Sequence, residues 1–126
     1  MFHKETIMTI RKLIDKVQKE KPNTFTDEHM LLFVNEIEAD VAEELRREDF
    51  EEYTLDDMDE ELMVGRPYDR LYVSYLKSQV DYANEEYPSY QLNAEQHMID
   101  FKDFADWVVR TGQAFNWIPT KFRNIL

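Results

Sequence analysis

The three histidines are the side chains of this chain that most readily bind metals or transfer protons at neutral pH. His3, His29 and His97 each lack a second histidine three to five positions away, the spacing that puts two zinc ligands on one helix face. The Glu-x-x-His pattern of di-iron bundles is also absent, because Thr26 and Ala94 stand three residues before His29 and His97. No metal site is therefore predicted.

His97 lies three residues before Asp100, so the two side chains can share one helix face. The neighbouring apolar residues favour a different interpretation, in which His97 is a histidine at the edge of the core. Carboxylates give little guidance about acid–base chemistry, because 27 Asp and Glu residues in a chain of 126 place some pairs together by chance. We predict no catalytic acid–base pair.

Nucleophiles and phosphate-binding loops are also missing from the sequence. Ser74, Ser78 and Ser89 lack the flanking glycines of a nucleophile elbow. The chain has only two glycines, Gly65 and Gly112, which are too few and too far apart for a loop that cradles phosphates. We therefore predict that the protein is not an enzyme and that it binds no cofactor.

The segment Glu48–Glu61 is the most strongly charged part of the chain, with nine acidic residues among fourteen. It lacks the glycine and the closing glutamate of a calcium-binding EF-hand loop. We interpret it as a connecting segment, with a short turn near 55–58, that is anchored to the core by Phe50, Tyr53, Leu55 and Met58. The remaining alternatives are a calcium site and an acidic docking surface, whose candidate residues are Glu51, Glu52, Asp56, Asp57, Asp59, Glu60 and Glu61.

The composition of the chain limits the kinds of molecule that the protein can bind. The net charge is −12 and the sequence pI is about 4.6, which disfavours a protein that binds nucleic acid or an anionic membrane surface. A basic protein surface is still a suitable partner, and so is a target of a protein that imitates nucleic acid. There is no cysteine, no secretory signal and no apolar run long enough to span a bilayer, so we expect synthesis in the cytoplasm.

The scarcity of turn residues, two glycines and four prolines, favours an all-α fold. A first helix is predicted from Thr9 until Pro22 ends it, and a second over about 27–47 with Thr26 as its N-cap. Both have apolar residues at the 3.6-residue period of a helix. In the second helix the glutamates, including Glu38, are predicted to lie off the apolar face.

The stretch 65–86 is the helix around which the rest of the chain is organised. Pro67 is predicted to occupy its first position, followed by an apolar stripe rich in tyrosine. Aromatic residues exceed what a core of this size needs, so some are assigned to a subunit interface: Tyr68, Tyr72, Tyr75 and Tyr82. A last helix is predicted over about 89–111, starting either at Ser89 as N-cap or around Pro88, and ending at Gly112. The two helices are expected to form an antiparallel hairpin in a four-helix domain.

The segment 113–126 differs from the rest of the chain, because it has no acidic residue. It contains two basic residues and six large apolar ones, more apolar surface than a free terminus normally carries. We divide the chain into a helical domain, 1–112, and a C-terminal docking segment, 113–126. This segment packs either on its own domain or on a neighbouring subunit or partner through Phe115, Trp117, Ile118, Lys121, Phe122, Arg123, Ile125 and Leu126.

Two stretches resemble a known family. These are MTIRKLIDKVQKEKPNTFTDEHMLLFVNEIEADVAEEL and PYDRLYVSYLKSQVDYANEEYPSYQLNAEQHMIDFKDFADWVVR, with the run YxxYLKSQVDYAN and the ending FADW. They resemble the small all-helical proteins encoded beside the capsid genes of tailed phages of Gram-positive bacteria, the head–tail connector (adaptor) proteins. The similarity covers about residues 8–111 and includes no catalytic motif.

The resemblance implies a structural virion protein of the phage neck. It implies a homo-oligomeric ring, commonly of twelve subunits, that lies between the portal protein and the next neck or tail-completion protein. DNA would pass through without sequence-specific binding, and an acidic channel surface would repel it. In this interpretation the segment 48–61 faces the channel or the next tail ring, and the segment 113–126 docks on the portal.

An alternative from another class is an acidic inhibitor that imitates DNA, of the anti-restriction or anti-CRISPR type, acting on a host nucleic-acid-binding protein. Its charges would form a regular double row on an elongated surface. The concentration of charge at 48–61 favours the connector.

Overall fold

A computed structural model describes residues 8–112 of the protein. Within that range it contains the helices α1 (Ile10–Glu20), α2 (Asp27–Glu44), α3 (Arg70–Ala83) and α4 (Tyr87–Thr111), and a short 3-10 helix, η2 (Leu55–Asp57). No strand occurs in this range. Thr9 and Glu61 form an isolated antiparallel bridge. The predicted all-α fold class is confirmed.

Side-chain caps start the first two helices, at Thr26 as predicted and also at Thr9, where the first helix is predicted to begin. The hydroxyl of Thr9 accepts the N–H of Lys12 at 3.2 Å, and that of Thr26 accepts the N–H of His29 at 3.1 Å. Such caps satisfy backbone donors that the first turn of a helix leaves unpaired. α2 ends at Glu44, three residues before the predicted end, because Arg46 takes a left-handed conformation with φ of 58°.

The predicted start of α3 needs correction, whereas α4 starts at the second of its two predicted positions, around Pro88. α3 begins at Arg70 and not at Pro67, because the N–H of Tyr68 bonds back to the carbonyl of Gly65 at 3.0 Å and so closes a separate turn. α4 begins at Tyr87, so Pro88 lies inside its first turn, where a missing N–H is tolerated. Gly112 ends α4 as predicted, in the left-handed conformation.

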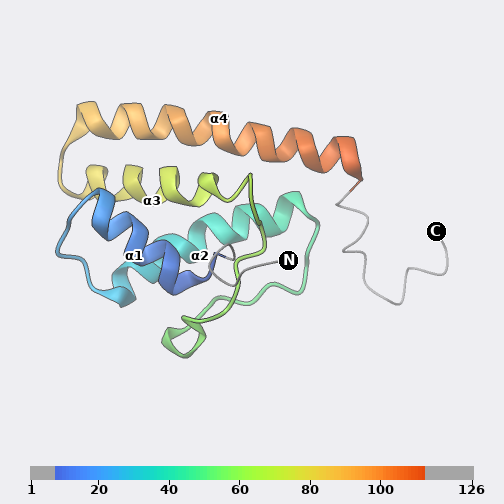
Figure 1. Cartoon of the computed structure of the whole chain (residues 1–126), viewed down its shortest axis with the longest axis horizontal. Coiled ribbons are helices and arrows are strands. Elements are labelled where there is room, and N and C mark those ends of the chain that lie inside the picture. Colours follow the sequence, from blue (N-terminus) through green and yellow to red (C-terminus); the bar gives the residue numbers. More distant parts are fainter. Residues whose placement is uncertain (1–7, 113–126) are drawn as a thin grey trace.

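α3 lies at the centre of the molecule, with α1 and α2 on one side and α4 along the other (Figure 1). α3 and α4 run side by side in opposite directions, joined by the short connection 84–86 (Figure 1). The most deeply buried side chains come from all four helices: Ile10, Leu13, Val17, Met30, Val34, Ile37, Val41, Leu71, Tyr72, Leu76, Val80, Phe104 and Val108.

The long segment between α2 and α3, residues 45–69, is held against α1 by backbone hydrogen bonds. The N–H of Ile10 donates to Glu60 at 3.1 Å, that of Arg11 to Met58 at 2.8 Å, and that of Leu62 to Met8 at 3.1 Å. Met58 is buried as predicted, whereas Leu55 is 46% exposed and does not anchor the segment. None of the helices in residues 8–112 is both long and apolar enough to cross a bilayer.

Candidate functional site

His97 lies at the edge of the core, as predicted. Its Nδ1 is 2.9 Å from the carbonyl oxygen of Leu71, and its ring packs between Tyr75 and Phe101. Burial lowers the pKa of His97, against the opposing effects of that carbonyl and of Asp100. The neutral imidazole donates its Nδ1 proton to the carbonyl of α3, so His97 links α4 to α3.

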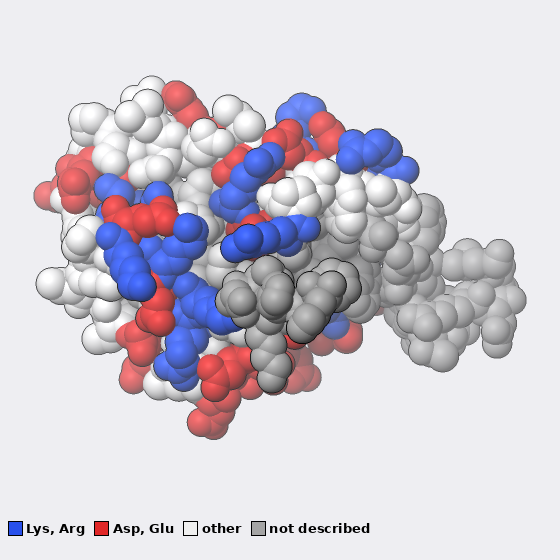
Figure 2. All heavy atoms as spheres, in the orientation of Figure 1, with Lys and Arg blue, Asp and Glu red and all other residues white. Residues whose placement is uncertain are grey.

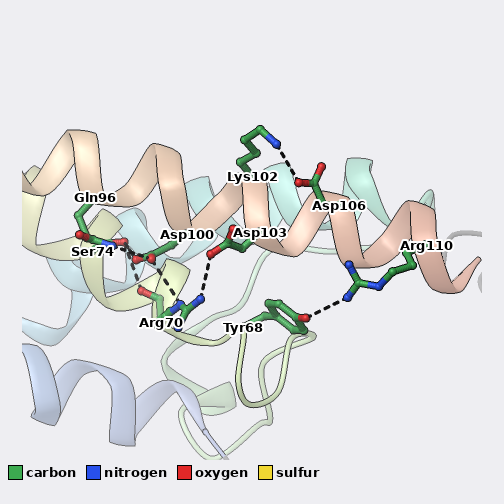
Figure 3. Close-up of polar contacts among 9 residues, drawn as sticks. All are labelled: Tyr68, Arg70, Ser74, Gln96, Asp100, Lys102, Asp103, Asp106 and Arg110. Atoms are coloured by element: carbon green, nitrogen blue, oxygen red, sulfur yellow. Dashed lines mark hydrogen bonds and ion pairs between the residues drawn. The ribbon is translucent and has the colours of Figure 1, made fainter.

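Asp100 has other partners than His97 (Figure 3). Ser74 and Gln96 each donate a hydrogen bond to its carboxylate at 2.9 Å, and Nε of Arg70 lies 3.4 Å from the same group. Arg70 also pairs with Asp103 at 2.9 Å. Because Asp100 is only 2% exposed, its carboxylate is enclosed within the α3–α4 contact.

Asp81 joins three helices at the opposite end of the α3–α4 pair. Its buried carboxylate lies 2.5 Å from the ammonium of Lys21 and accepts hydrogen bonds of 2.7 Å from Ser89 and Asn93. Burial acts to raise the pKa of Asp81, but the bonds from these partners outweigh it, and the pKa lies below its usual value. Ser89, one of the two predicted starts of the last helix, is therefore a partner of Asp81 and not an N-cap.

Among residues 8–112, no group of three or more His, Asp or Glu side chains is arranged to hold a metal ion. The acidic segment therefore provides no calcium cage, and its charges serve other purposes. Asp57 caps η2 by accepting the N–H of Thr54 at 2.7 Å, and Asp59 pairs with Arg11 at 3.1 Å. The others of the set, Glu51, Glu52, Asp56, Glu60 and Glu61, are exposed.

Glu38 fixes the acidic segment to the core. It is fully buried, and its carboxylate accepts hydrogen bonds from the hydroxyls of Tyr53 at 2.7 Å and Tyr72 at 2.5 Å and from the N–H of Met63 at 3.0 Å. Asn35, one turn before Glu38, exchanges two hydrogen bonds with the backbone of Tyr53, at 2.8 and 3.0 Å. The prediction that Glu38 lies off the buried face is wrong.

The electrostatic environment of Glu38 follows from this burial. Loss of water raises the pKa of Glu38 above its ordinary value of 4.5, although its three hydrogen bonds act in the opposite direction. Burial and the adjacent carboxylate raise the pKa of Tyr72 as well, so both tyrosines remain hydrogen-bond donors. A carboxylate with three donors is a structural anchor, because no lone pair faces solvent.

The four tyrosines assigned to a subunit interface lie in different environments. Tyr72 is 0% exposed in the core of its own chain, so its assignment to an interface is wrong. Tyr68 and Tyr75 are half-buried and engage Arg110 and Glu36. Tyr82 is 57% exposed and stacks on Tyr87 and Tyr90. Residue type and helical spacing alone do not separate the core tyrosine from the surface ones.

α4 has a large apolar surface without a partner in residues 8–112. Only three of its 25 residues, Asp100, Phe104 and Val108, are buried. Leu92, Ile99 and Val109, which we call the outer face of α4, are 70%, 56% and 79% exposed. Leu92 and Ile99 stand two helical turns apart, so they lie on the same side. Leu92, Met98 and Val109 are residues of the types found in cores, yet they are exposed.

Charges of both signs are present on the surface. Figure 2 shows Lys and Arg gathered over α1 and the start of α3, with Asp and Glu between and around them. Lys16 pairs with Glu20, Lys77 pairs with the same glutamate, and both distances are 2.6 Å. The docking residues predicted in 113–126, and His3, lie outside the described residues.

Sequence reasoning missed the two most informative features, buried Glu38 and the exposed outer face of α4. The signal for Glu38 was present, because it stands one residue after Ile37 and one turn from Val34 and Val41, all fully buried. Comparison of the chain with protein-family models, with curated proteins and with solved structures gave no match.

Proposed function

We propose that the protein is a structural subunit of the head–tail connector of a tailed phage, which forms a ring beneath the portal and continues the DNA channel. The observation that carries the proposal is the outer face of α4. Its three large apolar side chains, Leu92, Ile99 and Val109, are 56–79% exposed and have no cover among residues 8–112. Apolar patches of this kind mark surfaces that another protein covers.

The α3–α4 pair supplies the rigidity that such a contact requires. Three polar links run along the pair: Asp81 at one end, Asp100 in the middle, and at the other end the 3.4 Å contact between Arg110 and the hydroxyl of Tyr68, just before α3. Figure 3 shows the second and third of these links. A pre-formed surface loses less conformational entropy on association than a flexible one. The pair is therefore suited to repeat side by side around a ring axis.

The acidic segment suits a surface exposed to DNA. Its exposed carboxylates are held in position by Glu38, Asn35 and the backbone bonds to α1. A fixed array of negative charge repels the duplex and lets it slide without being bound. The segment 113–126, which has basic and apolar side chains, would dock on the portal.

The charge distribution favours the connector over the DNA mimic. An imitation of the duplex requires an uninterrupted negative surface, whereas the face in Figure 2 interleaves Lys and Arg with Asp and Glu. The acidic residues are instead concentrated in one connecting segment. We therefore keep the connector as the proposed function.

The test is mass measurement of the purified full chain, alone and with portal rings. We expect a ring-sized complex with the portal, and we expect Ile99→Asp to abolish it, because a charge at the centre of the outer face opposes burial. Gln91→Asp is the matched control, since it adds the same charge to an exposed polar position of α4. Equal assembly by both variants would remove the outer face from the proposal.

Deletion of residues 113–126 tests the portal contact separately. We expect the shortened chain to keep its helical circular dichroism and to lose portal binding. A shortened chain that binds the portal as well as the full chain does would take this segment out of the proposed contact.

A further inference from the structure

A groove separates the C-terminal half of α2 from the middle of α4. It has a volume of about 650 Å³ and is lined by Asp40, Glu43, Glu44, Arg46, His97, Met98, Phe101 and Lys102. We call this the α2–α4 groove. Met98, 70% exposed, and half-buried Phe101 form its apolar part. Grooves of roughly this size, about 300–1,000 Å³, hold the equivalent of a few aromatic side chains.

The carboxylates of α2 give this groove a negative rim. Asp40, Glu43 and Glu44 outnumber the two cations of the lining, Arg46 and Lys102, and Lys102 is already paired with Asp106 at 2.8 Å. Burial and, to a lesser degree, the charge of Glu43 raise the pKa of Asp40, against the opposing effect of His97. A cationic, aromatic segment therefore matches the groove in both charge and polarity.

We propose that the α2–α4 groove binds the C-terminal segment of the same chain, residues 113–126. This segment has no acidic residue, and it supplies two cations and six large apolar side chains. Lys121 and Arg123 complement the carboxylate rim, and Trp117 with its apolar neighbours covers Met98 and Phe101. The groove and the segment are the two parts of this chain whose charge and polarity fit each other best.

The segment is long enough to reach the groove of its own chain. Phe101 and Met98 lie about 16 Å and about 21 Å from Gly112 along the helix. An extended chain reaches about 17 Å by Trp117 and about 33 Å by Phe122, so Trp117 can cover Phe101 and Phe122 can cover Met98. Gly112, with φ of 68°, ends α4 and releases the chain from the helix axis. A short tether raises the effective concentration of the segment to the millimolar range, which favours the same chain over a second copy.

This inference goes beyond the connector function, because it concerns the free protein and holds without a portal. If the connector function is also correct, the groove shields the docking segment until the portal displaces it. Shielding of an apolar segment in the free chain reduces association before assembly.

The experiment uses Trp117 as a probe in the full chain. The protein has two tryptophans, so Trp107→Phe leaves Trp117 as the single emitter. We expect acrylamide to quench Trp117 several-fold less than it quenches free tryptophan. Met98→Lys places a cation in the groove, and we expect it to restore quenching to nearly the free value. Leu92→Lys is the matched control, since Leu92 is equally exposed on α4 but does not line the groove.

A second measurement keeps the native Trp107, which packs on Tyr68 and Phe104. In the chain labelled with 5-fluorotryptophan, the fluorine resonance of Trp117 should shift in Met98→Lys and not in Leu92→Lys. Full quenching of Trp117 in the parent chain overturns the proposal. So does a shielding that disappears on dilution together with a dimer mass, because the occupant is then a second copy. Neither readout involves the portal, so this proposal fails independently of the connector function.

Discussion

Around Glu38 a carboxylate is completely buried, whereas along the outer face of α4 large apolar side chains are exposed to solvent. The buried carboxylate is stabilised by three donors from Tyr53, Met63 and Tyr72, which fix the acidic segment. The exposed face has no such internal partner in residues 8–112. The contrast teaches that residue type alone does not decide burial in this chain: a carboxylate with three donors is buried, and apolar side chains of α4 remain exposed.

The largest expected difference in stability is between substitutions of two adjacent valines of α4. Val108 is 2% exposed and Val109 is 79% exposed. Val108→Asp places an unpaired charge in the core and should destabilise the chain by more than about 4 kcal/mol, enough to unfold many domains. Val109→Asp should change the stability by less than about 0.5 kcal/mol. Urea denaturation followed by circular dichroism measures both, and similar effects of the two changes would refute the assigned faces.

Removal of the Glu38 carboxylate tests the other region. Glu38→Ala leaves two hydroxyls and the N–H of Met63 without a partner in the core, and should destabilise the fold by about 3–5 kcal/mol. Glu36→Ala is the control on the same helix, because its exposed carboxylate accepts a single bond from Tyr75. It should lose less than about 1 kcal/mol in the same urea experiment. A small loss for Glu38→Ala would mean that the acidic segment is held mainly by its backbone bonds.

The pH dependence of stability distinguishes the two protonation states of Glu38. Its pKa is raised in the folded chain, so the folded state holds the proton more tightly than the unfolded state does. The resulting stabilisation is present below about pH 4.5 and is lost as the pH rises through the folded pKa. Relative to Glu38→Gln, the native chain should therefore be more stable at pH 4 than at pH 7. A difference that is constant with pH, or that grows toward neutral pH, contradicts the assigned burial.

Arg46 lies between the two regions, where α2 ends, and gives the smallest expected effect. A residue other than glycine with φ of 58° is strained, so Arg46→Gly should stabilise the fold by about 0.5–1 kcal/mol. The melting temperature should rise by about 2–5 °C. Glu43→Gly, three residues earlier and inside α2, should lower stability by a similar amount, because glycine there is disfavoured in a helix. A decrease for both variants would show that the guanidinium of Arg46 contributes more than its strain removes.

The sequence predicts the helices well, because their signals are local. The caps at Thr9 and Thr26 and the glycine at position 112 each depend on a few neighbouring residues. The start of α3 was less predictable, since the turn from Gly65 to Tyr68 competes with a helical start at Pro67. Local signals therefore give element types more reliably than boundaries.

The burial of individual side chains depends on tertiary packing and could not be predicted in the same way. Tyr72 and Tyr82 belong to one apolar stripe, yet one is in the core and the other on the surface. The spacing of Glu38 from Val34 and Val41 indicates the buried side of α2, but no helical period can indicate that tyrosines from two distant segments reach its carboxylate. Leu92 and Val109 have the types of core residues but face outward. Such positions are where the interpretation of this sequence needed the structure.

The three donors to Glu38 belong to Tyr53, to Met63 ten residues later, and to Tyr72 nine residues after that. Opening of this carboxylate therefore releases the whole connecting segment at once and not one end at a time. Its amide protons should exchange with solvent as one cooperative unit, at similar free energies from Tyr53 to Val64. For a surface that DNA would slide past, this means that the charged face is either entirely in place or entirely lost.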